Sequence, residues 1–156
     1  MIRKLTIALV VMSALAITAG AALAANPHYV GPKTPTGSIN TSTGGLIINF
    51  KAAGYGSGQT VNWSLSGTYS ITWGCITPPR SNEPSGLVSS SGNITASGSL
   101  TADRTGTLSG PITVFTPAPF SCPSPNMHPV LVSVSYDVTF YLDDIGGYPV
   151  TAWYTR

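Results

Sequence analysis

The stretch Tyr69-Ser-Ile-Thr-Trp-Gly-Cys75 has a large or apolar residue at every second position, with small or polar residues between them. Because successive side chains of a β-strand point to opposite faces, this period of two predicts a strand with one buried face. Cys75 lies on that buried face, and the only other cysteine, Cys122, lies far downstream in a proline-rich segment. The stretch therefore predicts an all-β fold and supplies one half of a candidate cross-link.

The same alternation recurs on both sides of this stretch. It predicts further strands over residues 46–52, 60–66, 92–101, 107–115, 130–142 and 148–154, and a short edge strand over 38–41. The proline-rich segments 76–84 and 116–129 are expected to be loops, because proline lacks the N–H that a central strand needs. Seven or eight short strands are typical of an antiparallel immunoglobulin-like β-sandwich. A closed barrel is the alternative, and periodicity does not separate the two.

Turn residues predict how these strands are joined. Residues 67–68, 103–106 and 144–147 each contain glycine, which tolerates the positive φ of tight turns, and each is expected to close a hairpin. The first hairpin joins 60–66 to the Tyr69 strand, the second joins 92–101 to 107–115, and the third joins 130–142 to 148–154. The inward positions define the expected core: Leu46, Ile48, Phe50, Val61, Trp63, Leu65, Ile71, Trp73, Val132, Val134, Tyr136 and Val138.

The N-terminus has the pattern of a secretory signal. Arg3 and Lys4 precede an apolar run over residues 5–19, and Ala22-Leu-Ala24 supplies the small residues of a cleavage site before Ala25. We expect a cleaved signal peptide (1–24), an extended leader (25–37) and one β-sandwich domain (38–156). An uncleaved anchor is the alternative, although a span needs about 20 apolar residues. After cleavage we expect no membrane span and a secreted or cell-envelope location.

The charges of the expected mature chain balance. Of the seven Lys and Arg residues, Arg3 and Lys4 leave with the signal, so five cations face five Asp and Glu residues. A nucleic-acid-binding protein carries a clustered basic surface, and the remaining cations are scattered along the chain. We therefore expect no nucleic-acid partner.

The two cysteines predict a disulfide. Export to an oxidising compartment favours pairing of Cys75 with Cys122. A catalytic thiol is the alternative, and it would need a histidine nearby to activate it.

Metal-binding and catalytic patterns are weak. His28 and His128 are isolated and lack the spacing that holds zinc, and Asp143 and Asp144 offer oxygens to calcium without the regular acidic spacing of a calcium loop. The chain has no Gly-x-Ser-x-Gly elbow. We therefore expect no catalytic residue, no metal site and no cofactor.

Aromatic residues gather near the last hairpin. Tyr141, Tyr148, Trp153 and Tyr154 lie close to its glycine turn in the sequence. The favoured interpretation is that most of these rings close one end of the sandwich and belong to the core. The alternative is an exposed platform that stacks on a sugar or packs on a partner protein, with Asp143 and Asp144 accepting hydrogen bonds at its edge.

Three motifs carry a family resemblance: Phe50-Lys-Ala-Ala-Gly-Tyr-Gly56, a loop after Cys75 that ends in Asn82-Glu-Pro84, and Ser121-Cys-Pro123 ahead of Val132-Ser-Val-Ser-Tyr-Asp-Val138. In these the chain resembles a group of small uncharacterised secreted proteins of bacteria. It departs from their pattern at Ile76 and in having few glycines in the loop. The resemblance implies an immunoglobulin-like domain with one disulfide, and no established activity or ligand.

Together these patterns predict a non-enzymatic secreted or cell-surface protein of structural or interaction type. The alternative is an extracellular module that binds carbohydrate or an envelope or matrix protein through the C-terminal aromatic hairpin. A secreted hydrolase is a second alternative.

Overall fold

The computed structural model describes residues 26–78 and 84–156, and this part of the chain contains strands and loops but no helix, so none that spans a membrane. Its strands are β1 (His28–Tyr29), β2 (Thr36–Asn40), β3 (Gly45–Asn49), β4 (Lys51–Ala53), β5 (Thr60–Ile76), β6 (Ser85–Thr101), β7 (Leu108–Ser109), β8 (Ile112–Phe115), β9 (His128–Leu142) and β10 (Gly146–Thr155). The expected signal peptide and residues 79–83 of the expected loop lie outside the described residues. The all-β prediction is confirmed.

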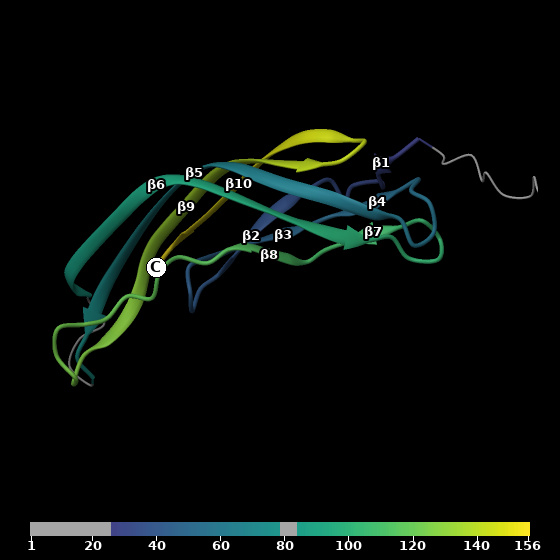
Figure 1. Ribbon diagram of the computed structural model, residues 1–156. Helices are drawn as coiled ribbons and strands as arrows, with labels where there is room; N and C mark the ends of the chain where they lie inside the picture. The colour runs from purple at the N-terminus through teal and green to yellow at the C-terminus, as the bar shows by residue number, and fades with distance from the viewer. Residues whose placement is uncertain (1–25, 79–83) are drawn as a thin grey trace, which may run out of the picture.

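The strands form three antiparallel sheets in two layers (Figure 1). One layer is the four-stranded sheet β10-β9-β5-β6. The sheets β2-β3-β8 and β1-β4-β7 lie end to end in the other, because only Phe50 separates β3 from β4. The four-stranded sheet is open, with β10 and β6 as its outermost strands, so the described strands do not close into a barrel.

The core lies between the two layers. The predicted inward face of residues 46–52 is confirmed, since Leu46, Ile48, Phe50 and Ala52 are at most 4 % exposed. The rest of the buried core comes mainly from β5 and β9 of the facing sheet: Val61, Leu65, Ile71, Trp73, Leu131, Val134, Tyr136, Val138, Phe140 and Leu142. Trp63 is only half-buried, with its ring centroid 6.1 Å from that of Phe140.

The hairpin predicted at residues 67–68 is wrong, because β5 runs unbroken through Gly67. Gly67 is opposite Val138 in β9, and a Cβ atom there would meet the Asp137 carbonyl oxygen and lie 2.5 Å from the Val138 Cα. Glycine inside a strand marks a close approach of another backbone as readily as a turn. Gly67 therefore lets two central strands pack closely.

The hairpin predicted between 92–101 and 107–115 is also wrong. The turn at 103–106 forms, but it carries the chain from one layer to the other: β6 pairs with β5, β7 with β4, and β8 with β3. Strand β6 also begins at Ser85, where the two apolar residues, Leu87 and Val88, are adjacent and so show no alternating pattern. The true hairpin is β5–β6, which pairs Thr60 with Thr101 at its open end.

Val132, predicted to lie in the core, is displaced by a β-bulge. Thr72 pairs with Ser133 and Trp73 with Leu131, so Val132 has no partner on β5. The extra residue reverses the alternation along β9. As a result Leu131 is 5 % exposed in the core and Val132 is half-buried outside it.

Both ends of the domain agree with the sequence in part. The last hairpin is confirmed, with β10 paired to β9 from Gly146–Leu142 to Thr155–Ser133. The segment expected to be an extended leader contributes β1, which pairs with β4.

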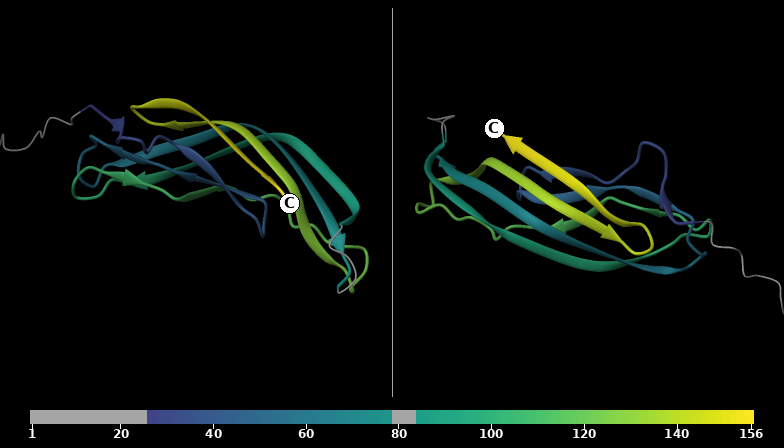
Figure 2. Two further views of the ribbon diagram at one scale, coloured as in Figure 1. Left: turned by 180° about the vertical axis from the view of Figure 1, so that it is seen from behind. Right: turned by 90° about the horizontal axis from the view of Figure 1, so that it is seen from above.

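The predicted Cys75–Cys122 disulfide is confirmed, with the two Cα atoms 5.9 Å apart. Strands β5, β6 and β9 extend past the second layer at this end of the molecule (Figures 1 and 2). The disulfide fastens the proline-rich 116–127 segment there, and Phe120 of that segment stacks on Trp73 at 6.1 Å and 12°. The loop thus covers Trp73 at the end of the sheet that the shorter layer does not reach.

Candidate functional site

The alternation of β10 divides the aromatic residues for which the sequence offered a common platform as an alternative. Tyr148 and Tyr154 are half-buried and pack against the core, whereas Trp153 points to the outer face and is 77 % exposed. The Tyr148 ring contacts Tyr29 edge to face, with centroids 5.9 Å apart. The structure therefore does not bring the three rings together on one surface.

Tyr154 belongs to a different surface hollow. It lines a space of ≈ 400 Å³ together with Trp73, Arg156 and the start of β9. The Arg156 backbone N–H donates to the Val132 carbonyl oxygen at 2.9 Å, which holds the end of the chain against the β-bulge. Tyr154 thus packs against the core at the end of β10.

Asp143 fastens the β9–β10 turn to its neighbours. Its carboxylate accepts a hydrogen bond from the Asn62 side-chain amide at 3.0 Å, and its carbonyl oxygen accepts one from the Tyr55 hydroxyl at 2.8 Å. Asp144 occupies the turn itself with φ 68°, a left-handed conformation that Asp tolerates better than most residues. The two carboxylates lie by the turn, beyond Leu142, which is seven strand positions from Ser135, the partner of Trp153 in the β9–β10 ladder, or about 24 Å.

The outer face of the four-stranded sheet carries a regular array of hydroxyl groups. We call it the hydroxyl face, and it comprises the alternate residues from Ser64 to Thr72 on β5, from Ser89 to Ser97 on β6, and from Ser133 to Thr139 on β9. All of these side chains are exposed or half-buried. All but Asn93 and Asp137 are Ser or Thr.

Strand register aligns these side chains in rows across the sheet. One row is Thr151, Asp137, Thr68 and Asn93, and the next is Trp153, Ser135, Ser70 and Ser91. Neighbouring strands are about 4.8 Å apart, and neighbouring rows on one face about 6.8 Å apart. The face is therefore a lattice of small polar groups, with Trp153 projecting at one margin.

A shallow depression crosses the other end of the hydroxyl face. It has a volume of ≈ 360 Å³ and is lined by Ser64, Ser66, Thr95, Ser97 and the Tyr141 ring, which is 46 % exposed. A second depression of ≈ 430 Å³ adjoins it, shares Ser64 and Ser97, and ends at Asp143. Of the residues predicted for the site, the structure thus places Tyr141 and Asp143 beside this depression.

The chemistry of the face is nearly neutral. Each hydroxyl both donates and accepts hydrogen bonds, and the Thr72 and Ser89 hydroxyls lie 2.9 Å apart. Asp137 is the one carboxylate within the array, and Asp143 lies at its rim. Such a surface suits a neutral ligand with many hydroxyl groups better than a strongly charged one.

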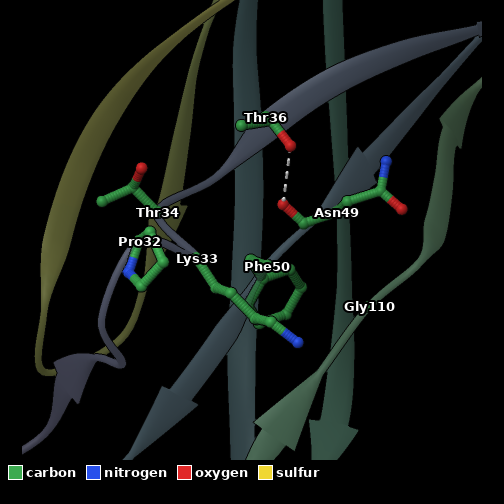
Figure 3. Close-up of a pocket in the computed structure, with 7 residues that line it drawn as sticks. All are labelled: Pro32, Lys33, Thr34, Thr36, Asn49, Phe50 and Gly110. Atoms are coloured by element: carbon green, nitrogen blue, oxygen red, sulfur yellow. Dashed lines mark hydrogen bonds between the residues drawn. The ribbon is translucent and has the colours of Figure 1, made fainter.

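Another hollow, of ≈ 310 Å³, lies in the second layer where β3 gives way to β4 (Figure 3). Its lining is Pro32, Lys33, Thr34, Thr36, Asn49, Phe50 and Gly110, and the Thr36 hydroxyl donates to the Asn49 carbonyl oxygen at 3.4 Å. Lys33 supplies the single charge of this lining. One exposed ammonium fixes a ligand poorly, so this hollow is a weaker candidate than the hydroxyl face.

Metal chemistry has no assembled site in the described part of the chain, where no three His, Cys, Asp or Glu side chains gather to hold an ion. His28 uses its Nδ1 in a 2.8 Å hydrogen bond with the Asn26 carbonyl oxygen.

Sequence reasoning examined the aromatic residues and overlooked the polar half of each alternating strand. The signal was present, because Ser64, Ser66, Thr68, Ser70 and Thr72 follow one another at every second position.

No protein-family model matches the chain, and no curated protein matches it.

Proposed function

We propose that this protein is an exported, non-enzymatic β-sandwich that acts by contact and binds neutral polysaccharide through its hydroxyl face. The observation that carries the proposal is Trp153, an indole ring 77 % exposed beside a regular array of Ser and Thr hydroxyls. Trp is enriched at contact surfaces, because its large apolar ring packs on a partner while its N–H group finds a hydrogen-bond acceptor.

A polysaccharide matches both components of this surface. Sugar hydroxyls pair with groups that donate and accept, which Ser and Thr provide in every row, and the apolar face of a sugar ring packs on an aromatic ring. Tyr141 and Trp153 are six strand positions apart in the β9–β10 ladder, which is about 20 Å. Two aromatic contacts at that distance favour an extended chain over a single sugar.

Export and an immunoglobulin-like architecture belong to the same proposal. The Cys75–Cys122 disulfide is a cross-link that persists in oxidising compartments, which supports a secreted or envelope location. If β3–β4 and β7–β8 are each counted as one interrupted strand, the ten described strands become eight. Eight antiparallel strands in two layers support the sandwich that both the periodicity and the family resemblance predict.

A pull-down against a panel of insoluble polysaccharides, with a glycan array alongside, tests the proposal. We expect the wild-type protein to be retained by at least one neutral polysaccharide, and Trp153→Ala to weaken retention at least about tenfold, since an aromatic hot spot contributes about 1.4 kcal/mol or more. Val88→Ala is the matched control, because Val88 is 50 % exposed but pairs with Trp73 and points away from the hydroxyl face.

Three results would count against the proposal. If no polysaccharide retains the protein, neutral polysaccharide is excluded as its ligand. If a secreted protein is recovered as the partner instead, an adhesive role is favoured. Hydrolysis of a polysaccharide or peptide, lost on substitution of one Asp or Glu, would make the protein an enzyme.

A further inference from the structure

Strand β6 leaves one long side of the four-stranded sheet unpaired. It spans Ser85–Thr101, 17 residues, and is hydrogen-bonded to β5 on one side only. The view from above shows it along one rim of the sheet, with β10 along the opposite rim (Figure 2, right). Its sequence, SGLVSSSGNITASGSLT, contains no proline and no charged residue.

The other sheet edges of the described chain are short or interrupted. Strand β10 carries Pro149 near its middle, which removes a backbone donor. Strands β2 and β8 have five and four residues, and β1 and β7 have two each. Folded proteins usually protect an edge with proline, lysine, a bulge or brevity, because a bare row of N–H and C=O groups pairs with another strand. Over most of its length β6 lacks these protections.

We propose that β6 pairs antiparallel with β6 of a second copy of this chain. The strand is neutral along its whole length, so two copies meet without like-charge repulsion, and nothing on the strand selects a partner of opposite charge. Two identical edges related by a two-fold axis form a closed pair, the commonest arrangement of homo-oligomers. Full overlap places Asn93, the middle residue of β6, opposite Asn93 of the second copy.

The size of this contact predicts its strength. It offers 17 residues from each copy, fewer than the 20 to 30 or so per side of a standard stable interface. The dimer is therefore reversible and depends on concentration. The two-fold axis is perpendicular to the sheet, so the hydroxyl faces of the two copies lie on the same side of the dimer. If the proposed polysaccharide binding holds, the pair binds a polymer at two sites and gains avidity. The pairing itself does not rest on that function.

Sedimentation velocity of the full mature chain tests the pairing, with no ligand present. Between about 10 μM and about 1 mM, the range in which a weak contact saturates, we expect the wild type to shift from monomer to dimer. The double variant Asn93→Lys/Thr95→Lys places positive charges on the edges of both copies, and these repel each other. It is therefore expected to stay monomeric. Ser66→Lys/Thr68→Lys is the matched control, since these residues pair with Thr95 and Asn93 in the same rows but one strand further from the edge.

A mixing experiment separates edge pairing from a general effect of charge. The Asn93→Lys/Thr95→Lys protein mixed with an equal amount of Asn93→Glu/Thr95→Glu protein is expected to recover the dimer, because Lys then faces Glu across the axis. A wild type that remains monomeric at about 1 mM overturns the proposal. So does a lysine edge variant that dimerises as the wild type does, or a mixture that stays monomeric.

Discussion

The hydroxyl of Tyr136 donates a hydrogen bond of 2.6 Å to the carbonyl oxygen of Gly44, which joins the middle of β9 to the turn before β3. Both residues are buried. Gly44 adopts φ +71°, and a Cβ atom at this position would lie 2.5 Å from the Ile71 side chain. This one bond therefore ties the two layers together at a point where only glycine fits.

Tyr136→Phe removes that bond and leaves the Gly44 carbonyl oxygen buried without its partner. We expect the free energy of unfolding to fall by about 1–3 kcal/mol, the cost of an unsatisfied buried polar group. Urea denaturation followed by fluorescence measures it. Tyr69→Phe is the control, since the Tyr69 hydroxyl is 3.5 Å from the Ser90 hydroxyl at an exposed site. A loss no larger than that of Tyr69→Phe would show that the Gly44 contact contributes nothing.

Alkaline pH weakens the fold through its buried tyrosines. Burial raises the pKa of Tyr29 to about 12, with Tyr148 adding to the shift, and burial followed by Asp144 raises that of Tyr55 to about 12. In the unfolded chain these hydroxyls ionise near pH 10. Above that pH the unfolded state loses protons that the folded state keeps, so stability that is complete below pH 10 declines up to about pH 12.

Urea midpoints measured at intervals from pH 8 to pH 12 check this expectation. The urea midpoint of Tyr55→Phe is expected to be lower at pH 8, because the variant loses the hydrogen bond to the Asp143 carbonyl oxygen. Its midpoint is also expected to decline less steeply above pH 10. An equal slope in the two proteins would exclude Tyr55 from the alkaline transition.

A single substitution at Gly67 tests whether this residue forms a turn or lets two strands pack closely. Gly67→Ala drives its Cβ into the backbone of β9 at Asp137 and Val138, and we expect a loss of about 3 kcal/mol or more. Gly92→Ala is the matched control on the adjacent edge strand, where the new Cβ meets only the Tyr69 ring at 3.5 Å and the change stays within about 0.5 kcal/mol. Equal melting temperatures for both variants would contradict the close packing of β5 on β9.

The same glycine shows what the sequence predicted and where it misled. Alternation located part of every long strand, and it placed Leu46, Ile48 and Phe50 correctly in the core. Pairing was harder, because the local sequence around Gly67 does not distinguish a turn from contact with Val138, 71 residues away on another strand. The bulge at Val132 had the same cause, since only the register against Thr72 and Trp73 reveals it.

The candidate site was predicted in part. Alternation alone places Trp153 and Tyr154 on opposite faces, so the alternative of a common platform conflicted with the period that defined their strand. The hydroxyl face requires the register of four strands, because its rows combine residues from β10, β9, β5 and β6.

Removal of the disulfide loosens one end of the molecule. The Cys75–Cys122 bridge spans 47 residues, and the loop entropy it removes from the unfolded chain corresponds to about 4 kcal/mol. We expect Cys75→Ala/Cys122→Ala to lose stability of this order and to expose Trp73 as Phe120 leaves it, with a red shift of the fluorescence. Hydrogen exchange is expected to rise in the 116–127 segment before it rises in β5. Uniform exchange across the sheet would contradict this local role.

Amide chemical-shift mapping tests the central claim most directly, with ¹⁵N-labelled mature protein and a soluble fragment of the polysaccharide that retains it. We predict that shifts concentrate on the hydroxyl face, at Ser64, Ser66, Thr95 and Ser97, and at Tyr141 and Trp153 on its margins. The hollow around Lys33 and Thr36 serves as the internal reference and is predicted to stay unchanged. Shifts that gather at that hollow, or at the half-buried Tyr148 and Tyr154, with none on the hydroxyl face, would contradict the account.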